Sequence, residues 1–324
     1  MTTKIFVADK VAESVQKSLH KLGEVLYRPT TKAGELPELI KDYNILVVRS
    51  TRVTEETIKS ATDLKMIIRA GAGTDNIDIP KATEHGVFVC NCPGTNSSAV
   101  AELVIGHMIC ADRLIHQTTE KLKKGTWCKT KFQGSMGLRG RNLGIVSLGY
   151  IGKLVAKAAQ GLGMVVYAYD PRKTQEIMDP WKITKMETLT ELVEISDVVT
   201  VHTVLTEKTK HMFNEEIFKR FKDGAIFINA ARGGIVDHTC LPKIVKEKGL
   251  KISLDVYEDE PSATSEDFPQ TELAKSITTL TPHIGASTKQ ASEAVGEMTV
   301  EIVQTYLSEK LPPMVNIKNR ELLK

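Results

Sequence analysis

Short apolar runs alternate with longer amphipathic segments along most of this 324-residue chain. Short runs of this kind are typical of strands, and the segments between them are typical of helices that connect neighbouring parallel strands. The pattern therefore predicts repeated βαβ units and an α/β sheet covered on both faces. Helices are expected at Glu13–Leu22, Glu55–Ser60, Lys153–Leu162 and Leu241–Lys248. The expected strands are Ile5–Ala8, Ile45–Val48, Met66–Ile68, Val87–Val89, Leu143–Ser147, Val165–Ala168, Val198–Val201, Ala225–Ile228, Ile252–Leu254 and Ile277–Leu280.

Length and composition exclude several other classes of protein. A chain of 324 residues suggests two domains, and 41% hydrophobic with 26% charged residues excludes a disordered or collagen-like chain. The formal net charge of +3 gives no reason to expect a nucleic-acid partner. No apolar run approaches the ~20 residues that a membrane span needs, and the opening MTTKIFVADK lacks the apolar region of a signal peptide. We therefore expect no membrane partner and a cytoplasmic location.

The five cysteines predict neither a disulfide framework nor a metal site. Cys90 and Cys92 are separated by one residue, the other three are isolated, and the chain contains no CxxC pair. An odd number of cysteines suits a reducing compartment. The chain also lacks an HExxH motif, an EF-hand loop and a Cys/His cluster, so no metal is expected.

One long helical segment interrupts the alternation. Residues 97–115 (SSAVAELVIGHMICADRLI) have no strand among them and can form a helix that crosses between two lobes. The basic, glycine-punctuated segment Thr118–Arg141 follows, and we interpret it as a long connection or arm. A second long helix is expected at Lys289–Leu307.

The segment LGIVSLGYIG contains a partial dinucleotide-binding motif. A predicted strand runs into Gly149 and Gly152, and a helix of small and apolar residues follows. In the motif GxGxxG, these two glycines let the backbone approach a pyrophosphate and let the helix pack closely on the strand. The helix N-terminus supplies N–H groups and partial positive charge for the phosphates. The first position of the motif is Ser147 instead of glycine.

An acidic residue at the end of the next predicted strand favours NAD as the cofactor. Asp170 lies 21 residues beyond Gly149 (170 − 149), where such a residue binds the ribose hydroxyls of the adenosine. A carboxylate at this point repels the 2′-phosphate of NADP. NAD is therefore favoured over NADP, and Arg172 is the one nearby residue that could accommodate NADP.

Three later strands end in groups that suit oxidation and reduction of an alcohol. AIFINAARGG ends at Arg232, KISLDVYEDEP runs through Asp255 to Glu260, and ITTLTPHIGAS reaches His283. An arginine matches a carboxylate and a developing oxyanion, and a histidine can exchange the hydroxyl proton as hydride leaves the carbon. A carboxylate can orient that imidazole, and Asp255 can hold the carboxamide of the cofactor. The alternative for each residue is a structural or solvated side chain.

Six segments in order resemble the D-isomer-specific 2-hydroxyacid dehydrogenases: IIRAGAGTDNID, LGIVSLGYIGK with Asp170, TVHTVLTEKT, NAARGGIVD, LDVYEDEP and TPHIGASTKQ. Within that family, VVRSTRVTEE, GTWCKTKFQG and PHIGASTKQA are most similar to the phosphoglycerate dehydrogenase branch. The resemblance implies a catalytic set of Arg232, Glu260 and His283. It implies cofactor contacts at Gly149, Tyr150, Ile151, Gly152, Asp170, His202, Thr203, Ala230 and Asp255. Two positions depart from the family pattern: Ser147, and Val204, where relatives usually carry proline.

The resemblance also implies a fold and a substrate. It implies two Rossmann-like or flavodoxin-like parallel-sheet domains with a cleft between them, the substrate domain being residues 1–97 with 284–324 and the NAD-binding domain residues 98–283. Substrate would contact Arg49, Arg69, Ala72 and Gly73, the two arginines near a phosphate. The segment 97–141 resembles the arm through which family members form homodimers. Only 41 residues follow His283 (324 − 283), so we expect no serine-sensing regulatory domain.

The activity that the resemblance implies is NAD-dependent oxidation of 3-phospho-D-glycerate to 3-phosphohydroxypyruvate, the first step of phosphorylated serine biosynthesis. Two alternatives stay open. The chain resembles hydroxypyruvate and glyoxylate reductases on the same scaffold. The family also includes corepressors, which use the fold as an NAD(H)-sensing binding module.

Overall fold

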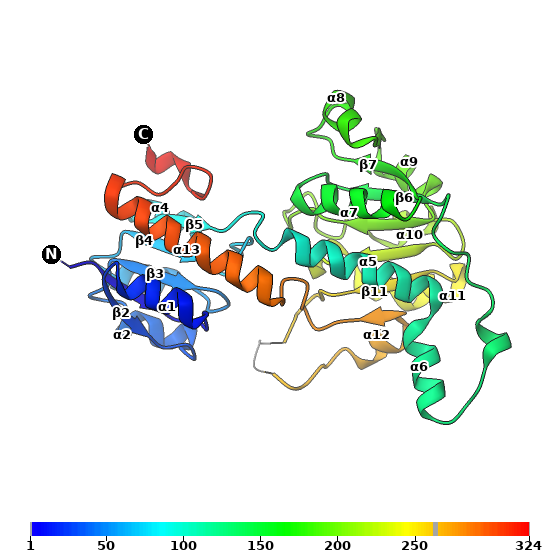
Figure 1. The fold of residues 1–324 in the computed structure, drawn as a ribbon, viewed down its shortest axis with the longest axis horizontal. Helices are drawn as coiled ribbons and strands as arrows, with labels where there is room; N and C mark the ends of the chain where they lie inside the picture. The colour runs from blue at the N-terminus through cyan, green and yellow to red at the C-terminus, as the bar shows by residue number, and fades with distance from the viewer. Residues whose placement is uncertain (1, 262–264, 324) are drawn as a thin grey trace. The chain divides into compact units, whose positions relative to one another are not determined.

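The computed structural model describes residues 2–261 and 265–323, and it divides them into two compact units. The first unit comprises the chain up to Asn96 together with the segment from Ser287 onward, and the second unit comprises Ser97–Ala286. Each unit is built on a parallel sheet with helices on both faces (Figure 1). The predicted fold class, two parallel-sheet α/β domains, is confirmed. Among the described residues, no helix is long and apolar enough to cross a membrane.

The first unit contains a five-stranded parallel sheet in the order β2-β1-β3-β4-β5. Its strands are β1 Lys4–Val7, β2 Glu24–Tyr27, β3 Ile45–Val48, β4 Met66–Arg69 and β5 Phe88–Asn91. Its helices are α1 Glu13–His20, η1 Ala33–Glu35, α2 Leu36–Leu39, α3 Glu55–Ser60, α4 Ile79–Glu84, α13 Lys289–Glu309 and η6 Arg320–Leu323. Alternate side chains of one strand go to opposite faces: Phe6 packs with the α2–α4 side, and Ile5 and Val7 pack with α1 and α13.

The second unit contains a seven-stranded parallel sheet in the order β12-β11-β10-β9-β6-β7-β8. Its strands are β6 Asn142–Val146, β7 Val165–Tyr169, β8 Thr184–Lys185, β9 Val198–Val201, β10 Ile226–Asn229, β11 Lys251–Leu254 and β12 Thr279–Leu280. Its helices are α5 Ser97–Arg113, α6 Ile115–Lys123, η2 Lys129–Phe132, α7 Tyr150–Gly161, α8 Gln175–Met178, η3 Asp179–Trp181, α9 Leu189–Ile195, α10 Glu215–Lys219, η4 Gly233–Ile235, η5 His238–Cys240, α11 Leu241–Lys248 and α12 Thr271–Ser276. α5 and α7 pack on one face, while α9, α10 and α11 cover the other (Figure 1).

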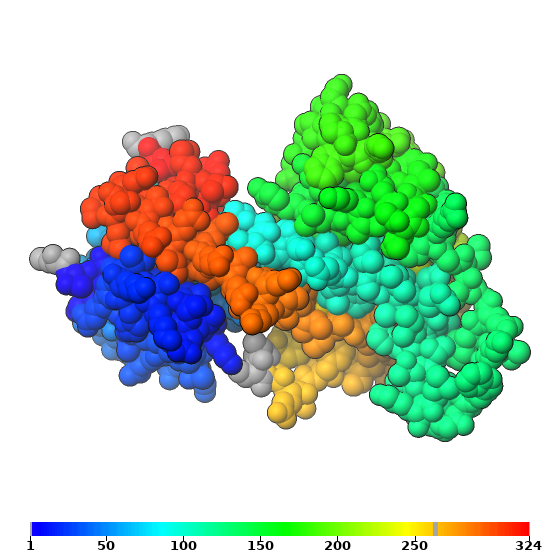
Figure 2. Space-filling view, viewed as in Figure 1, coloured from blue at the N-terminus to red at the C-terminus, as the bar shows by residue number. Residues whose placement is uncertain are grey.

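The structure differs from the sequence-based expectation at edge strands and at one helix. The edge strands β2 and β8 were not expected, because β2 is only partly buried and β8 has two residues. The helix expected at residues 97–115 ends at Arg113, since Leu114 adopts a left-handed backbone with a φ of 53°. α6 then begins at Ile115 and buries none of its residues, and most of it falls within the arm expected at Thr118–Arg141. α6 and the segment after it form a projecting lobe of the second unit (Figure 2).

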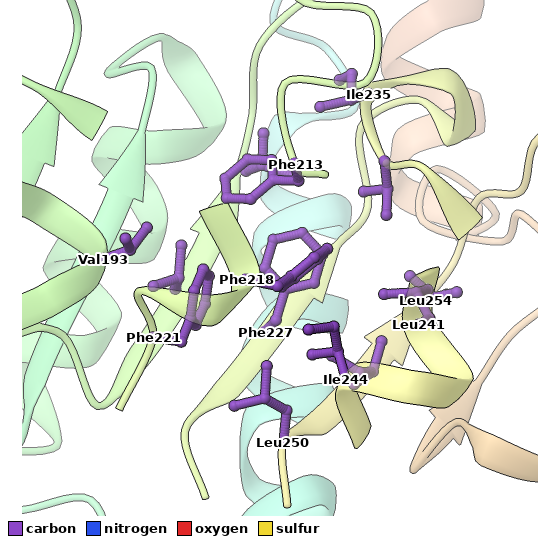
Figure 3. Packing of buried hydrophobic residues seen from close by; sticks show 14 of the residues in the cluster. Val193, Phe213, Phe218, Phe221, Phe227, Ile235, Leu241, Ile244, Leu250 and Leu254 are labelled. Atoms are coloured by element: carbon purple, nitrogen blue, oxygen red, sulfur yellow. The ribbon is translucent and has the colours of Figure 1, made fainter. Parts of the chain in front are cut away.

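Four phenylalanines fill the core beneath β10, the strand that leads to Arg232 (Figure 3). Phe213, Phe218, Phe221 and Phe227 are nearly or completely inaccessible to solvent. The Phe227 ring centroid lies 4.8 Å from that of Phe213 and 5.1 Å from that of Phe218, the latter pair edge-to-face. This cluster therefore supports the strand end from which the candidate site begins.

Replacing Phe227 tests how much this cluster stabilises the second unit. We expect Phe227→Ala to lower the free energy of unfolding by about 3–5 kcal/mol, because it leaves a cavity among three other rings. Phe227→Leu should cost less, since it retains most of the buried volume. Urea unfolding followed by circular dichroism measures both variants. Equal stability of the alanine variant and the unsubstituted protein would contradict this account of the core.

Candidate active site

The loops that follow three neighbouring strands of the second unit all begin at the same edge of the sheet. β10, β11 and β12 are parallel and adjacent, with Asn229 paired to Leu254 and Leu254 paired to Leu280. Arg232 follows β10, Glu260 follows β11 and His283 follows β12. The sheet topology therefore brings together the three residues that were predicted to be catalytic.

His283 and Glu260 form a short hydrogen-bonded ion pair. The His283 Nδ1 atom lies 2.6 Å from Glu260 Oε2, and Glu260 Oε1 accepts a 3.0 Å hydrogen bond from the backbone N–H of Tyr257. The side chain of His283 is 51% exposed and that of Glu260 is 31% exposed, so the imidazole remains accessible beside its held carboxylate. Because Nδ1 faces Glu260, Nε2 is the nitrogen left to exchange a proton with a substrate.

The contact between His283 and Glu260 shifts the pKa values of the two side chains in opposite directions. The hydrogen bond to Glu260 raises the pKa of His283, although burial of the ring acts against this. Burial favours the neutral form of Glu260, but the hydrogen bond from His283 and the charges of His283 and Arg232 outweigh it and lower the pKa of the carboxyl group. The arrangement thus favours an imidazolium that is stabilised by a carboxylate.

Arg232 is held at the start of its loop by the backbone. The buried Asn229 accepts a hydrogen bond from Ala231 N and donates one to Arg232 O, which fixes the turn after β10. The Arg232 guanidinium donates to Ala231 O at 2.7 Å. Gly233 lies against the Tyr257–Glu258 peptide, where a Cβ atom would be 1.9 Å from the carbonyl carbon of Tyr257. Only glycine therefore lets the Arg232 loop approach the Glu260 loop this closely.

Asp255 is buried and anchors the loop that carries His283. Its carboxylate accepts hydrogen bonds from Thr281 Oγ1 at 2.6 Å, Ile284 N at 2.8 Å and Gly285 N at 2.9 Å. Its backbone oxygen accepts from His283 N at 2.8 Å. The predicted contact of Asp255 with the cofactor carboxamide stays a prediction, and the interactions within the protein assign this side chain a supporting position.

Sequence reasoning missed His107 of α5, which supports the same loop. Its two ring nitrogens lie 2.8 Å from Thr279 Oγ1 and 3.0 Å from Thr281 Oγ1, and Thr281 in turn donates to Asp255. Burial lowers the pKa of His107 and so favours its neutral form. The available signal was a histidine that lies between the apolar residues of the stretch VIGHMICA in α5.

The dinucleotide motif forms the turn between β6 and α7. Ser147 occupies the first glycine position with a φ of 73°, a left-handed conformation that glycine adopts more easily. A Cβ atom on Gly152 would lie 2.6 Å from Ser147 O, so this glycine allows the helix to pack on the strand. A Cβ atom on Gly149 would meet no protein atom within 4 Å, which leaves space over the N-terminus of α7, beside Tyr150 and Ile151. This open approach to the helix N–H groups fits a bound pyrophosphate.

Asp170 follows β7 and is tied to the same turn. Its carboxylate accepts hydrogen bonds from Leu148 N at 3.0 Å and from Arg172 N at 3.1 Å, and it forms a 3.3 Å ion pair with Arg172 Nε. Burial disfavours its charge, but these backbone and arginine contacts dominate and lower its pKa. An ionised carboxylate therefore stands where the ribose hydroxyls were predicted to bind.

Three further predicted cofactor contacts lie after β9 and β10. His202 and Thr203 follow β9, and Ala230 follows β10. His202 Nε2 lies 3.1 Å from Thr200 Oγ1, while its Nδ1 atom is buried without a hydrogen-bond partner among the described residues. Burial lowers the pKa of His202 to about 3, so the ring is neutral. An unpaired buried nitrogen at this sheet edge fits a ligand that supplies the missing partner.

The predicted substrate contacts gather in the first unit, after β3 and β4. Arg69 Nε donates to Arg49 O at 3.1 Å, and the Arg69 guanidinium covers Gly71, where a Cβ atom would be 1.8 Å from Nη1. Gly71 has a φ of +154°, which favours glycine, and Ala72 and Gly73 follow it in the same loop. The structure thus brings Arg49, Arg69 and this loop together. Within the described residues, no cluster of His, Cys, Asp or Glu could hold a metal ion.

Comparison with known proteins assigns this chain to a family. The model of the D-isomer specific 2-hydroxyacid dehydrogenase NAD binding domain matches residues 105–285. The D-3-phosphoglycerate dehydrogenase of Methanocaldococcus jannaschii is 40% identical over 98% of this chain, which spans 61% of the length of that protein. The hydroxypyruvate reductase of Thermotoga maritima is also 40% identical, over 85% of this chain and 87% of that protein.

This chain belongs to the D-isomer-specific 2-hydroxyacid dehydrogenases. A solved NAD+-bound 3-phosphoglycerate dehydrogenase from Entamoeba histolytica is similar across both units, with a TM-score of 0.79 and 31% identity, covering 96% of this chain and 97% of that one. The predicted family and its NAD cofactor are confirmed. The chain is therefore an oxidoreductase by family, and its second unit carries the NAD-binding domain.

The ion pair between His283 and Glu260 gives the stability of the protein a specific pH dependence. The raised pKa of His283 stabilises the folded state below the ordinary value of 6.5, and this stability is lost as pH rises through the folded value. The lowered pKa of Glu260 stabilises the folded state above the ordinary value of 4.5, and this stability is lost as pH falls through the folded value.

Removing the carboxylate charge tests this coupling directly. We expect Glu260→Gln to lower the pKa of His283, because the hydrogen bond to Glu260 is the largest cause of its elevation. NMR titration of the histidine Cε1–H signals measures the change, and the spectrum of His283→Gln assigns the signal. Glu194→Gln, at an exposed ion pair with Arg220 on the surface, is the matched control. An unchanged titration in Glu260→Gln would rule out the pairing.

Proposed function

We propose that this protein catalyses NAD-dependent oxidation of 3-phospho-D-glycerate to 3-phosphohydroxypyruvate, the first step of phosphorylated serine biosynthesis. The observation that carries the proposal is the catalytic set Arg232, Glu260 and His283 at a sheet edge that also carries the dinucleotide motif. Similarity to the Methanocaldococcus jannaschii phosphoglycerate dehydrogenase supports the substrate. In this proposal the first unit binds substrate and the second unit carries the reacting groups.

The residues of the second unit can move the proton and stabilise the charges that develop in this reaction. Nicotinamide, when bound, supplies the acceptor for the hydride that leaves C2 of the hydroxy acid. His283 Nε2 takes the proton of the C2 hydroxyl group as the carbonyl forms. Glu260 stabilises the resulting imidazolium through the 2.6 Å hydrogen bond to Nδ1. Arg232 pairs with the substrate carboxylate and with the oxygen on which charge develops in the reverse reaction.

The first unit offers groups for the two anionic ends of this substrate. The N–H groups of Ala72 and Gly73 would receive the carboxylate, and Arg49 and Arg69 would receive the phosphate. Asp9 accepts hydrogen bonds from the N–H groups of Arg49, Ser50 and Thr51 at 2.6–3.1 Å, which orders the loop that carries Arg49. A loop held in this way loses little entropy when it binds a ligand.

A second candidate is the reduction of hydroxypyruvate on the same site. The observation that favours it is the 40% identity to the Thermotoga maritima hydroxypyruvate reductase, of which this chain matches 87%. The two activities differ in the phosphate group of the substrate and share the set of Arg232, Glu260 and His283.

The projecting lobe of α6 and residues 124–140 supports a homodimer in this proposal. Trp127 is 78% exposed and Met136 is 81% exposed on this segment. Large apolar side chains at this exposure are typical of a surface that another protein covers.

A comparison of substrates tests the proposed activity. Purified protein with NAD and 3-phospho-D-glycerate should form NADH much faster than with D-glycerate, because only the phosphorylated acid can use Arg49 and Arg69. Absorbance at the NADH maximum follows the reaction, and hydroxypyruvate reduction is measured in parallel. Faster turnover of the unphosphorylated acids would favour the second candidate, and binding of NADH without turnover of any hydroxy acid would overturn both.

Substitution of Arg69 tests the phosphate-binding role. We expect Arg69→Gln to raise KM for 3-phospho-D-glycerate by roughly 10- to 100-fold, because a charge-assisted hydrogen bond is lost. KM for D-glycerate should change by less than about threefold, as that substrate has no phosphate. Arg320→Gln is the control. Its neighbour Asn319 forms hydrogen bonds with Val87 and Val89 at the amino end of β5, whereas Arg69 lies at the carboxyl end of β4. Equal effects on both substrates would contradict the assignment.

A further inference from the structure

Glu258 is a junction between four segments of the second unit. Its Oε1 atom lies 2.8 Å from His211 Nε2, and its backbone N–H donates to His238 Nδ1 at 3.4 Å. Its carbonyl oxygen accepts a hydrogen bond from Gln270 Nε2, and Gly233 packs against its backbone nitrogen. Glu258 precedes Glu260 by two residues, so these contacts hold the turn that presents the catalytic carboxylate.

His211 connects this turn to the loop that begins at Arg232. The backbone N–H of His211 donates to Gly234 O at 2.9 Å, while its side chain pairs with Glu258. One residue therefore contacts the Arg232 loop through its main chain and the Glu260 turn through its imidazole. The loop that carries His211 is itself paired with the Arg232 loop, since Phe213 N donates to Ile235 O and Asp237 N donates to Phe213 O.

The backbone of His211 is strained although its side chain makes only a partly exposed contact. His211 has a φ of 49°, in the left-handed region that glycine occupies with less strain. Its side chain is 37% exposed and that of Glu258 is 33% exposed, so solvent screens this contact and limits its contribution to global stability. Because the contact between His211 and Glu258 adds little stability, its effect on the position of the nearby Glu260 turn is the better explanation for the strain at His211.

We propose that His211 is a positioning residue, which sets the placement of Glu260 relative to Arg232 through its contact with Glu258. This role rests on the proposed hydroxy-acid oxidation. Displacement of Glu260 weakens its hydrogen bond to His283 and thereby slows proton transfer at His283 Nε2. Misplacement of a catalytic group by about 1 Å is sufficient to slow a reaction by up to about 10²-fold.

The decisive variant removes the imidazole and preserves the backbone. His211→Gly is compatible with the positive φ and leaves the backbone hydrogen bonds of this loop in place. We expect it to lower kcat about tenfold, with KM for the hydroxy acid and Kd for NADH within about twofold of the unsubstituted protein. Glu258→Ala should have the same effect, and His211→Gln, which retains a hydrogen-bond donor, should restore most of kcat.

A substrate-independent measurement accompanies the kinetics. NMR titration of His283 should show its pKa falling toward 6.5 in His211→Gly and Glu258→Ala, since each loosens the Glu260 contact. Glu194→Gln, at a surface ion pair of the same unit, should leave both kcat and the titration of His283 unchanged. If His211→Gly does not fold by circular dichroism, Glu258→Met replaces it, because this variant keeps the length of the side chain and removes the oxygen that contacts His211 Nε2.

Unchanged kcat and an unchanged His283 titration in both variants would overturn the positioning role. A parallel loss of NADH binding would also overturn it, because that result indicates general disruption of the unit. If the unsubstituted protein oxidises no hydroxy acid, the proposed function is wrong, and the NMR titration alone then decides whether His211 controls the Glu260–His283 pair.

Discussion

Parallel pairing of β10, β11 and β12 is the constraint on which the proposed catalytic set of Arg232, Glu260 and His283 depends. Parallel strands all end at one edge of a sheet, so the loops after them begin within the distance between neighbouring strands. Arg232 lies three residues beyond the end of β10 (232 − 229), and His283 lies three beyond the end of β12 (283 − 280). Glu260 lies six beyond the end of β11 (260 − 254), which gives its turn the length to reach His283 over the neighbouring strand.

Such short loops require unusual backbone conformations, and the structure holds each of them with several contacts. His283, three residues after β12, has a φ of 52°, and its N–H donates to both Asp255 O and Thr281 O. The Asp255 carboxylate then binds the next two N–H groups of the same loop. Strained residues persist where their surroundings determine the conformation, and here that determination comes from one buried carboxylate. The accessible imidazole of His283 is therefore carried by a loop that several hydrogen bonds to Asp255 hold in place.

Most strands of the two sheets, and the proximity of Arg232, Glu260 and His283, could be predicted from the sequence. Strands such as Ile45–Val48 and Val198–Val201 are buried on both faces and form continuous apolar runs, so their bounds were predicted exactly as observed. Arg232, Glu260 and His283 follow such strands, and parallel topology implies that they meet. β2, β8 and α6 were missed because they bury little apolar surface, and apolar burial is what generates the pattern.

The supporting residues could not be predicted, because their roles depend on contacts between segments far apart in the chain. His107 reaches Thr281 across 174 residues, and His211 reaches Glu258 across 47 residues. Neither spacing repeats a motif, and each histidine alone is compatible with a structural role. Asp255 shows the same limit: its position after β11 suggested a contact with the cofactor, and its carboxylate also accepts three hydrogen bonds from the loop after β12, 26 to 30 residues further along the chain.

Substrate choice depends on different residues from those that perform the chemistry. Two relatives with different named activities are each 40% identical to this chain, so overall identity does not distinguish phosphorylated from unphosphorylated acids. In the proposed reaction Arg232, Glu260 and His283 act at the carbon that bears the hydroxyl group, which both substrate classes share. Discrimination must therefore come from groups that contact the distal end of the substrate. The guanidinium of Arg69, lying over Gly71 in a conformation that only a residue without a Cβ atom permits, is the feature of the first unit best placed to provide it.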